Sequence, residues 1–303
     1  FLCRNWIRQI QVEFISKKIT KINLSENRIE ALPDDFFSSL PNLTHLYLSK
    51  NEITHFPSSI GDSKIVLLSF SENPIEQFPE KLPDSLHVLH CAYCGLKNLP
   101  NYIAEMPGIK TIDASGNQFK SFLTLDKDSV PQNISPDDQD SDSESENSSR
   151  FFPALEKLFL SSNTIKEFPL NLPRALSVLD LSMNKIKEIP EETAKQLPNL
   201  VDFSMSYNRL EKLPEDFRFS FMTSLKIDHN TSLVGALDIS HFRKLRNLDI
   251  CCTRDIALNN MNLQEPEKNI QEIITSNLKF QEEDSPVFKF IYPENIGKFV
   301  GYA

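Results

Sequence analysis

A single pattern of apolar and polar positions recurs along most of the chain. Its clearest copy runs from Leu179 to Pro190 and reads Leu-x-Leu-x-x-Asn-x-Ile-x-x-Ile-Pro. The two leucines alternate with a polar residue, which indicates a short strand with one apolar face. Ile186 and Ile189 return to the same interior, and the proline ends the phrase. Asn184 falls at a sharp turn, where its amide can donate to and accept from backbone groups that lack a strand partner.

Ten copies of this phrase lie between residues 19 and 258. The asparagine position, called here the ladder position, is occupied in order by Asn27, Asn51, Asn73, Cys94, Asn117, Asn163, Asn184, Asn208, Asn230 and Thr253. Successive ladder positions are 21 to 24 residues apart, except for one interval of 46. A fixed period of this length predicts a solenoid in which each coil buries its apolar face against its neighbours. Replacing Asn184 by Ala is expected to cost about 1–3 kcal/mol of stability.

The phrase and its period resemble those of leucine-rich repeat proteins. The resemblance implies an α/β solenoid, or horseshoe, of about ten repeats with a short parallel strand in each coil. Residues 1–18 are then an N-terminal cap or a truncated upstream repeat, in which Trp6 is expected to plug the core. Residues 259–303 are predicted to close the last coil as a cap and, near their end, to begin a further domain.

Two elements are predicted within the C-terminal segment. The isoleucines of Glu265–Leu278 have helix-like spacing, which favours a short capping helix. Val287–Tyr292 is expected to form a strand. The sequence has no initiator Met and stops within an apolar run, so we expect a fragment of a longer protein.

The doubled interval between Asn117 and Asn163 holds one repeat and a surplus that maps to residues 123–150. Residues 135–149 contain no hydrophobic side chain, so the segment is predicted to be disordered. Eight acidic and two basic residues lie in 125–150, which supplies most of the chain's net charge of −10. Two interpretations stay open. The insertion is a solvated surface loop, or it is an arm regulated by phosphorylation at Ser135, Ser141 and Ser143.

The strands of such a solenoid line a concave surface, and the phrase identifies its exposed positions. The candidate partner-binding residues flank the inward leucine in repeats two to six. They are His45, Tyr47, Leu67, Val88, His90, Asp113, Lys157 and Phe159. Aromatic and apolar groups on a rigid sheet are the usual anchors of a protein interface, although single exposed apolar residues are ordinary. The matching positions of repeats seven to ten are largely acidic, which favours a basic partner surface.

The sequence shows no motif typical of catalysis or cofactor binding. It has no phosphate-binding loop, dinucleotide fingerprint, His-Glu-x-x-His motif or nucleophile elbow, so we expect no enzymatic activity and no cofactor. Cys91 and Cys94 form a Cys-x-x-Cys pair. However, Cys91 occupies an inward leucine position and Cys94 a ladder position, which favours buried structural roles over a metal site. The acidic balance argues against nucleic acid, and no apolar run is long enough to predict a membrane span.

The repeat endings resemble those of one group of intracellular leucine-rich repeat proteins. Ala31–Pro33, His55–Pro57 and Lys212–Pro214 carry the Leu-Pro or Phe-Pro ending of Ras-binding scaffolds and Scribble-type polarity proteins. This resemblance implies a non-catalytic scaffold whose partner is a small GTPase or another signalling protein. The five cysteines do not cluster at the ends of the array, as they do in disulfide-capped secreted repeats, and this favours a cytoplasmic location.

A second resemblance concerns the last five residues. Phe299–Ala303 is similar to the opening strand of metal-dependent (PPM-type) serine/threonine protein phosphatases. It implies an alternative in which the array is the targeting region of such a phosphatase, with a catalytic domain that begins near Phe299. The metal-binding motifs of that family would lie beyond this chain, so both interpretations leave the chain itself without catalysis.

Overall fold

The computed structural model describes residues 2–11, 15–122, 151–170, 172–238 and 241–259, with backbone alone from 257, and the backbone of 272–275 and 299–301. The chain divides into two compact units. Unit 1 comprises Phe1–Thr164 and Pro169–Ala175, and unit 2 comprises Ile165–Phe168 and Leu176–Ala303. Both are stacks of coils with a short parallel strand in each repeat, which confirms the predicted leucine-rich-repeat solenoid. The insertion 123–150 with Ser135, Ser141 and Ser143, and the predicted strand 287–292, lie outside the described residues.

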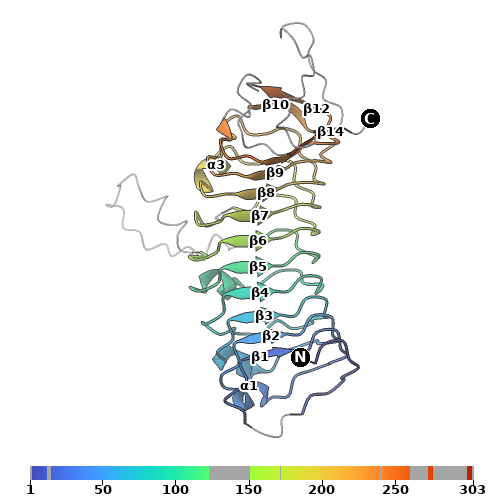
Figure 1. Cartoon of the computed structure of the whole chain (residues 1–303), viewed down its shortest axis with the longest axis vertical. Helices are drawn as coiled ribbons and strands as arrows, with labels where there is room; N and C mark the ends of the chain where they lie inside the picture. Colours follow the sequence, from blue (N-terminus) through green and yellow to red (C-terminus); the bar gives the residue numbers. More distant parts are fainter. Residues whose placement is uncertain are drawn as a thin grey trace, which may run out of the picture. The chain divides into compact units, whose positions relative to one another are not determined.

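Unit 1 contains one strand for each of the first six repeats, stacked in chain order (Figure 1). The strands are β1 (Lys21–Asn23), β2 (His45–Tyr47), β3 (Leu67–Ser69), β4 (Val88–His90), β5 (Thr111–Asp113) and β6 (Lys157–Phe159). All neighbouring pairs are parallel and in matched register. Short helical turns come after the proline that ends a repeat. They are α1 (Phe36–Ser39), η1 (Ser58–Asp62) and η2 (Asn101–Glu105).

Unit 2 continues the same phrase and adds further strands. Its main strands, in pairing order, are β7 (Val178–Asp180), β8 (Asp202–Ser204), β9 (Ser224–Lys226), β11 (Asn247–Asp249), β13 (Glu272–Thr275) and β14 (Phe299–Gly301). Every pair is parallel. In a separate parallel pair, β10 (Val234–Asp238) is hydrogen-bonded to β12 (Asp255–Asn259). The short helix α3 (Thr193–Gln196) comes after the proline that ends repeat seven.

The core is built from the inward residue at the centre of each strand and the apolar residues that come after the ladder position. Leu46, Leu68 and Leu89 have no exposed surface. Aromatic rings also pack in the core, as in unit 1, where Phe56 meets Phe70 edge-on at 5.1 Å between ring centroids. Each coil is too thin to bury these side chains alone, so the apolar burial that stabilises one coil depends on the coils beside it.

The ladder asparagines are buried and bridge successive coils, as their position in the phrase predicts. In Asn51, Nδ2 donates to the backbone oxygens of Leu48 at 2.8 Å and Leu24 at 3.0 Å. Its Oδ1 accepts from the backbone N–H of Ile29 at 3.0 Å. The same pattern recurs in both units. At Cys94 the thiol takes over only the donor role, toward the backbone oxygen of Phe70 at 3.4 Å.

Each residue just before a ladder position has a left-handed backbone, as at Glu26 (φ 58°), Met183 (φ 55°) and His229 (φ 54°). This conformation turns the chain sharply out of the strand. In repeat five the position is Gly116 (φ 65°), and a Cβ there would lie 2.3 Å from the ring of Tyr93. Except at Gly116, the left-handed position therefore projects a side chain at a fixed place in each repeat.

Residues 2–7 reproduce the backbone pattern of a further repeat. Arg4 has the left-handed φ of 59°, and Asn5 donates to the backbone oxygens of Leu2 and Cys3. The amide of Asn27 donates to Leu2 and accepts from Ile7, as a ladder residue does toward the preceding coil.

The prediction that Trp6 plugs the core was wrong. Its side chain is 75% exposed, and the guanidinium of Arg28 lies 4.2 Å from the ring centroid. Trp6 comes after Asn5 in the repeat phrase, as Arg28 comes after Asn27, and this position faces solvent.

The predicted capping helix over Glu265–Leu278 was also wrong. Glu272–Thr275 forms strand β13, in which Ile273 pairs with Leu248 of β11. The isoleucine spacing was compatible with a helix, but this segment supplies the next strand of the stack.

Candidate functional site

The register of the strands in unit 1 aligns the eight predicted partner-binding residues in two rows. The first row runs through His45, Leu67, Val88, Thr111 and Lys157. The second runs through Tyr47, Ser69, His90, Asp113 and Phe159. Neighbouring strands in a sheet are about 4.8 Å apart, so side chains in one row contact their neighbours. The structure thus brings all eight residues onto one continuous strand face.

Most side chains on this face are half-buried, so each presents an edge or a tip to solvent. Tyr47, Leu67, Val88 and Phe159 supply its apolar and aromatic surface. Burial, with a smaller contribution from Lys21, lowers the pKa of His45, so its imidazole is neutral at pH 7. The Oδ1 atom of Asp113 accepts the backbone N–H of Ser115 at 3.1 Å, which holds the carboxylate in place. The face combines apolar contact area with a few fixed polar groups.

Three large exposed apolar side chains lie at the left-handed position, which the sequence-based selection of sites missed. Tyr93 in unit 1 is 59% exposed, and in unit 2 Met183 is 56% and Tyr207 51% exposed. All three directly precede a ladder residue. A comparison of that position across the repeats would have found them, whereas only the two outward strand positions of each repeat were selected.

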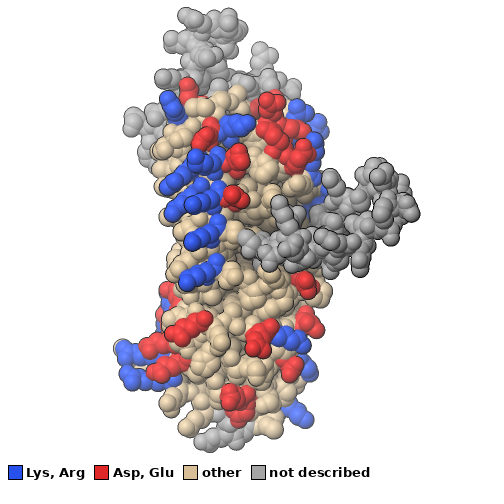
Figure 2. Space-filling view, turned by 180° about the vertical axis from the view of Figure 1, so that it is seen from behind, with Lys and Arg blue, Asp and Glu red and all other residues tan. Residues whose placement is uncertain are grey.

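Charge in unit 2 differs between the strand face and the segments after the ladder residues. Asp180, Asp202 and Asp249 lie at outward strand positions. Exposed basic side chains lie just after the ladder residues, namely Lys185, Lys187, Arg209 and Lys212. Seen from behind, lysine and arginine side chains gather in a column along one edge of the C-terminal half (Figure 2). Of these four, Lys187 forms an ion pair with Glu211 at 3.5 Å.

The Cys-x-x-Cys pair occupies structural positions. Cys91 is fully buried, and Cys94 bonds to backbone oxygens. Burial raises the pKa of both thiols, to about 11 for Cys94, so both stay protonated at neutral pH.

Residues able to hold a metal gather elsewhere, in unit 2. They are His229 with Cys251 and Cys252, and Asp228 with Asp249 and Cys251. Neither group was selected from the sequence.

In the part of the chain that the structure describes, no helix has the length and apolar character needed to cross a bilayer.

Comparison with known proteins identifies the repeats. The pattern of the family described as "Leucine rich repeat" matches residues 17–75 and 174–231. The chain is 28% identical to osteomodulin of Bos taurus over 219 residues, which cover 70% of this chain and 41% of osteomodulin. It is 30% identical to fibromodulin of Sus scrofa over 105 residues, which cover 34% of this chain and 71% of the fibromodulin sequence. The chain therefore spans about two fifths of the length of the osteomodulins that it matches.

Solved structures share the fold at lower identity. The leucine-rich effector protein YopM from Yersinia pestis superposes with a TM-score of 0.63 at 20% identity, covering 89% of this chain and 63% of YopM. At this identity the likeness concerns the fold alone.

Proposed function

Because the chain belongs to the leucine-rich repeat proteins, we propose that it is a non-catalytic binding module whose protein partner docks on the strand face of unit 1. Leucine-rich repeat domains are in general protein-binding modules. Within this chain, the proposal concerns the two aligned rows of β2 to β6, and the anchors are Tyr47, Leu67, Val88 and Phe159.

The observation that carries the proposal is the continuity of these rows. Their backbone is fixed by parallel strand pairing and by the buried ladder on one side of it. Side chains held in this way lose little conformational freedom when a partner binds, which favours affinity. Aromatic anchors on such a surface contribute most of the binding energy in typical interfaces.

A cytoplasmic signalling protein, such as a small GTPase, is the proposed partner class. The Leu-Pro and Phe-Pro repeat endings support it. The five cysteines, all within the described residues, also support it, because they form no disulfide and two of them serve the core and the ladder. Fractionation of the source cells with an antibody against this chain tests the compartment. Recovery of the protein only in the culture medium would contradict the cytoplasmic assignment.

The binding face is tested by replacing Tyr47 and Phe159 together with Ala. Both side chains lie in the second row, so the double variant removes two anchors while the inward core residues stay in place. Partners captured from a lysate of the source cells are compared by quantitative mass spectrometry between the wild-type chain and the variant. We expect specific partners to fall at least about tenfold, since two anchors together commonly contribute more than 1.4 kcal/mol.

Leu170→Ala is the matched control. Leu170 is 64% exposed and also belongs to unit 1, but it comes after the proline that ends its repeat and lies outside the strands. The control should retain the partners that the double variant loses. Equal capture of partners by the wild type, the double variant and the control, with unchanged melting temperatures, would contradict the proposal that partners bind the strand face.

The phosphatase-linked alternative has the same binding mechanism and differs only in the sequence beyond Ala303. Its support is the similarity of Phe299–Ala303 to the opening strand of PPM-type phosphatases, and Phe299–Gly301 is strand β14. Sequencing of the native protein past Ala303 separates the two candidates. An Asp-Gly-His-Gly motif there would favour the phosphatase, and its absence from the complete native sequence would exclude it.

A further inference from the structure

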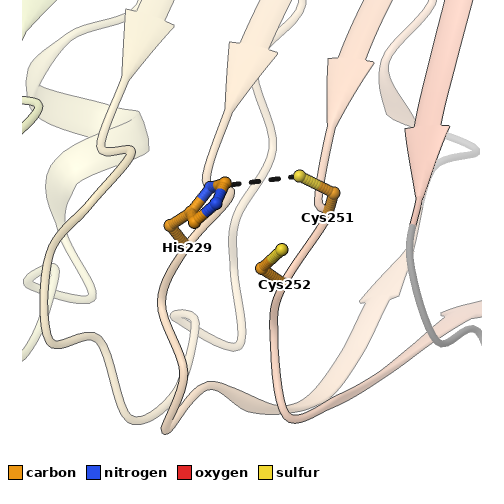
Figure 3. Close-up of side chains that lie close together, drawn as sticks. All are labelled: His229, Cys251 and Cys252. Atoms are coloured by element: carbon orange, nitrogen blue, oxygen red, sulfur yellow. Dashed lines mark hydrogen bonds between the residues drawn. The ribbon is translucent and has the colours of Figure 1, made fainter. Parts of the chain in front are cut away.

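The turns after β9 and β11 in unit 2 bring a histidine and two cysteines together (Figure 3). His229 comes after β9, and Cys251 and Cys252 come after β11. The backbone N–H of His229 donates to the backbone oxygen of Cys251 at 2.8 Å, which joins the two coils at this place. The potential ligand atoms of His229, Cys251 and Cys252 all lie within 4.8 Å of one another.

The backbone holds these side chains in position. His229 and Cys252 both have the left-handed conformation that precedes a ladder residue, with φ of 54° and 56°. The next residue, Asn230, is fully buried and donates to the backbone oxygens of Met205 and Ile227. The ladder therefore fixes the turn that presents the imidazole, and preorganised ligands lower the cost of binding an ion.

Further contacts hold the same groups in place. The ring of Tyr207 stacks on the imidazole of His229, with centroids 4.0 Å apart and planes 9° from parallel. Asp228 places Oδ2 at 2.8 Å from Nδ1 of His229, and its other oxygen accepts from the hydroxyl of Ser206. The backbone N–H of Cys251 donates to Asp249 at 3.2 Å. Hydrogen-bonded supports of this kind are typical of metal sites in proteins.

We propose that this cluster is a binding site for Zn²⁺, with Nδ1 of His229, Sγ of Cys251, Sγ of Cys252 and Oδ2 of Asp228 as ligands. Zinc prefers four tetrahedral ligands of this kind, at about 2.3 Å for sulfur and 2.0–2.2 Å for nitrogen and oxygen. Sγ of Cys251 lies 4.0 Å from Nδ1 of His229, so small side-chain rotations bring both within reach of one ion. The site differs from Cys91 and Cys94, which serve the core and the ladder.

Binding has a defined proton balance. The two thiols give up one proton each to solvent and bind as thiolates. His229 binds through Nδ1 as the neutral imidazole, which carries its proton on Nε2. Two protons are thus released for each ion, and the double positive charge of zinc offsets most of the negative charge of two thiolates and a carboxylate.

The test uses the full chain, reduced and freed of metal with a chelator, and titrated with Zn²⁺ in a calorimeter. We expect one ion per chain and release of two protons, measured from the dependence of the heat on buffer ionisation. Co²⁺ should give the visible and near-ultraviolet absorption of tetrahedral thiolate ligation. Cys251→Ser should lower the zinc affinity at least about 100-fold, and Asp228→Asn about tenfold.

Cys3→Ser is the matched control, since Cys3 is a partly exposed free cysteine of unit 1. It should leave stoichiometry and affinity unchanged. Where Cys251→Ser fails to fold, X-ray absorption of the zinc-loaded wild-type chain gives an independent answer, with two sulfur ligands expected. A chain that takes up no stoichiometric zinc, or an absorption spectrum without sulfur ligands, overturns the proposal.

Discussion

At the scale of single residues, each ladder asparagine hydrogen-bonds to two coils at once. Asn208 donates to the backbone oxygens of Leu181 at 2.8 Å and Met205 at 3.0 Å, and it accepts from Ile186 at 3.0 Å. All of these groups are buried, so truncation leaves backbone donors and acceptors without partners. This explains why the phrase requires a side chain with both a donor and an acceptor.

Asn208→Ala should therefore lower the free energy of unfolding by about 1–3 kcal/mol. Urea denaturation followed by circular dichroism measures it. Asn98→Ala is the control, because Asn98 is exposed between the buried residues Leu96 and Leu99, and its effect should stay within about 0.5 kcal/mol. Similar losses in both variants would show that the ladder bonds add no net stability.

Cys94 is a ladder residue with only weak, long hydrogen bonds from its thiol, at 3.4 Å. Its thiol cannot accept as an amide oxygen does, and the backbone N–H of Ile75 turns instead to the oxygen of Asn73 at 2.9 Å. Cys94→Asn restores the consensus side chain at nearly unchanged volume, so we expect a gain of about 1 kcal/mol at pH 7. Thermal and urea melts check this. A loss of stability would mean that the turn in repeat four has adapted to the thiol.

The difference in stability between the wild type and Cys94→Asn should also depend on pH. Burial raises the pKa of Cys94 from 9.0 to about 11 in the folded chain. Above pH 9 the unfolded chain loses this proton while the folded chain keeps it, so stability is complete below pH 9 and falls toward pH 11. The wild type should lose up to about 3 kcal/mol relative to Cys94→Asn over this range. A stability difference that stays constant from pH 8 to 11 would contradict the assignment.

At the scale of elements, the coil that carries the insertion is closed at its base by stacked rings. Phe122 and Phe152 lie at the two ends of the insertion, with centroids 5.7 Å apart and planes 19° from parallel. The backbone N–H of Phe152 also bonds to Ala104 at 2.6 Å. The base of the coil therefore depends on contacts outside residues 123–150.

Deletion of Ser135–Ser149 should then leave the melting temperature nearly unchanged. Shortening a loop by about half alters its closure free energy by only about 0.6 kcal/mol. Differential scanning calorimetry compares the deletion with Phe122→Ala, which removes one of the stacked rings and should cost about 3–5 kcal/mol. If the deletion lowers stability as much as Phe122→Ala does, the acidic segment takes part in the fold.

The strands were predictable from the sequence, because apolar and polar residues alternate in each repeat. Residues two positions apart on a strand face the same side, so this alternation identifies the inward and outward positions. The left-handed surface positions were missed because only the outward strand positions were selected. The candidate metal-binding cluster was missed because it depends on adjacency between coils. His229 and Cys252 occupy the same place in successive repeats, so a column-wise comparison of repeats would have joined them. Strand β13 was missed because it lacks the asparagine phrase. Trp6 was misplaced because Asn5 was not recognised as a ladder residue.

At the scale of the whole molecule, a stack of coils has mainly nearest-neighbour interactions, so a change at one place should stay local. The turn of residues 2–7 covers the first complete repeat. Ile7 donates to the side chain of Asn27, and the N–H of Arg28 donates to the oxygen of Ile7 at 2.9 Å. Nothing in this contact reaches repeats four and five.

Removing residues 1–7 should therefore speed hydrogen exchange in the first repeat and leave later repeats unchanged. The N–H of Arg28 loses its partner, and the amide of Asn27 loses two of its hydrogen bonds. Exchange measured by mass spectrometry should increase over residues 22–32 and stay constant over residues 88–119. Trp6→Ala is the control, since Trp6 is 75% exposed, and it should preserve protection throughout. A uniform increase along the chain would mean that the coils unfold as one cooperative unit, and the nearest-neighbour description would then fail.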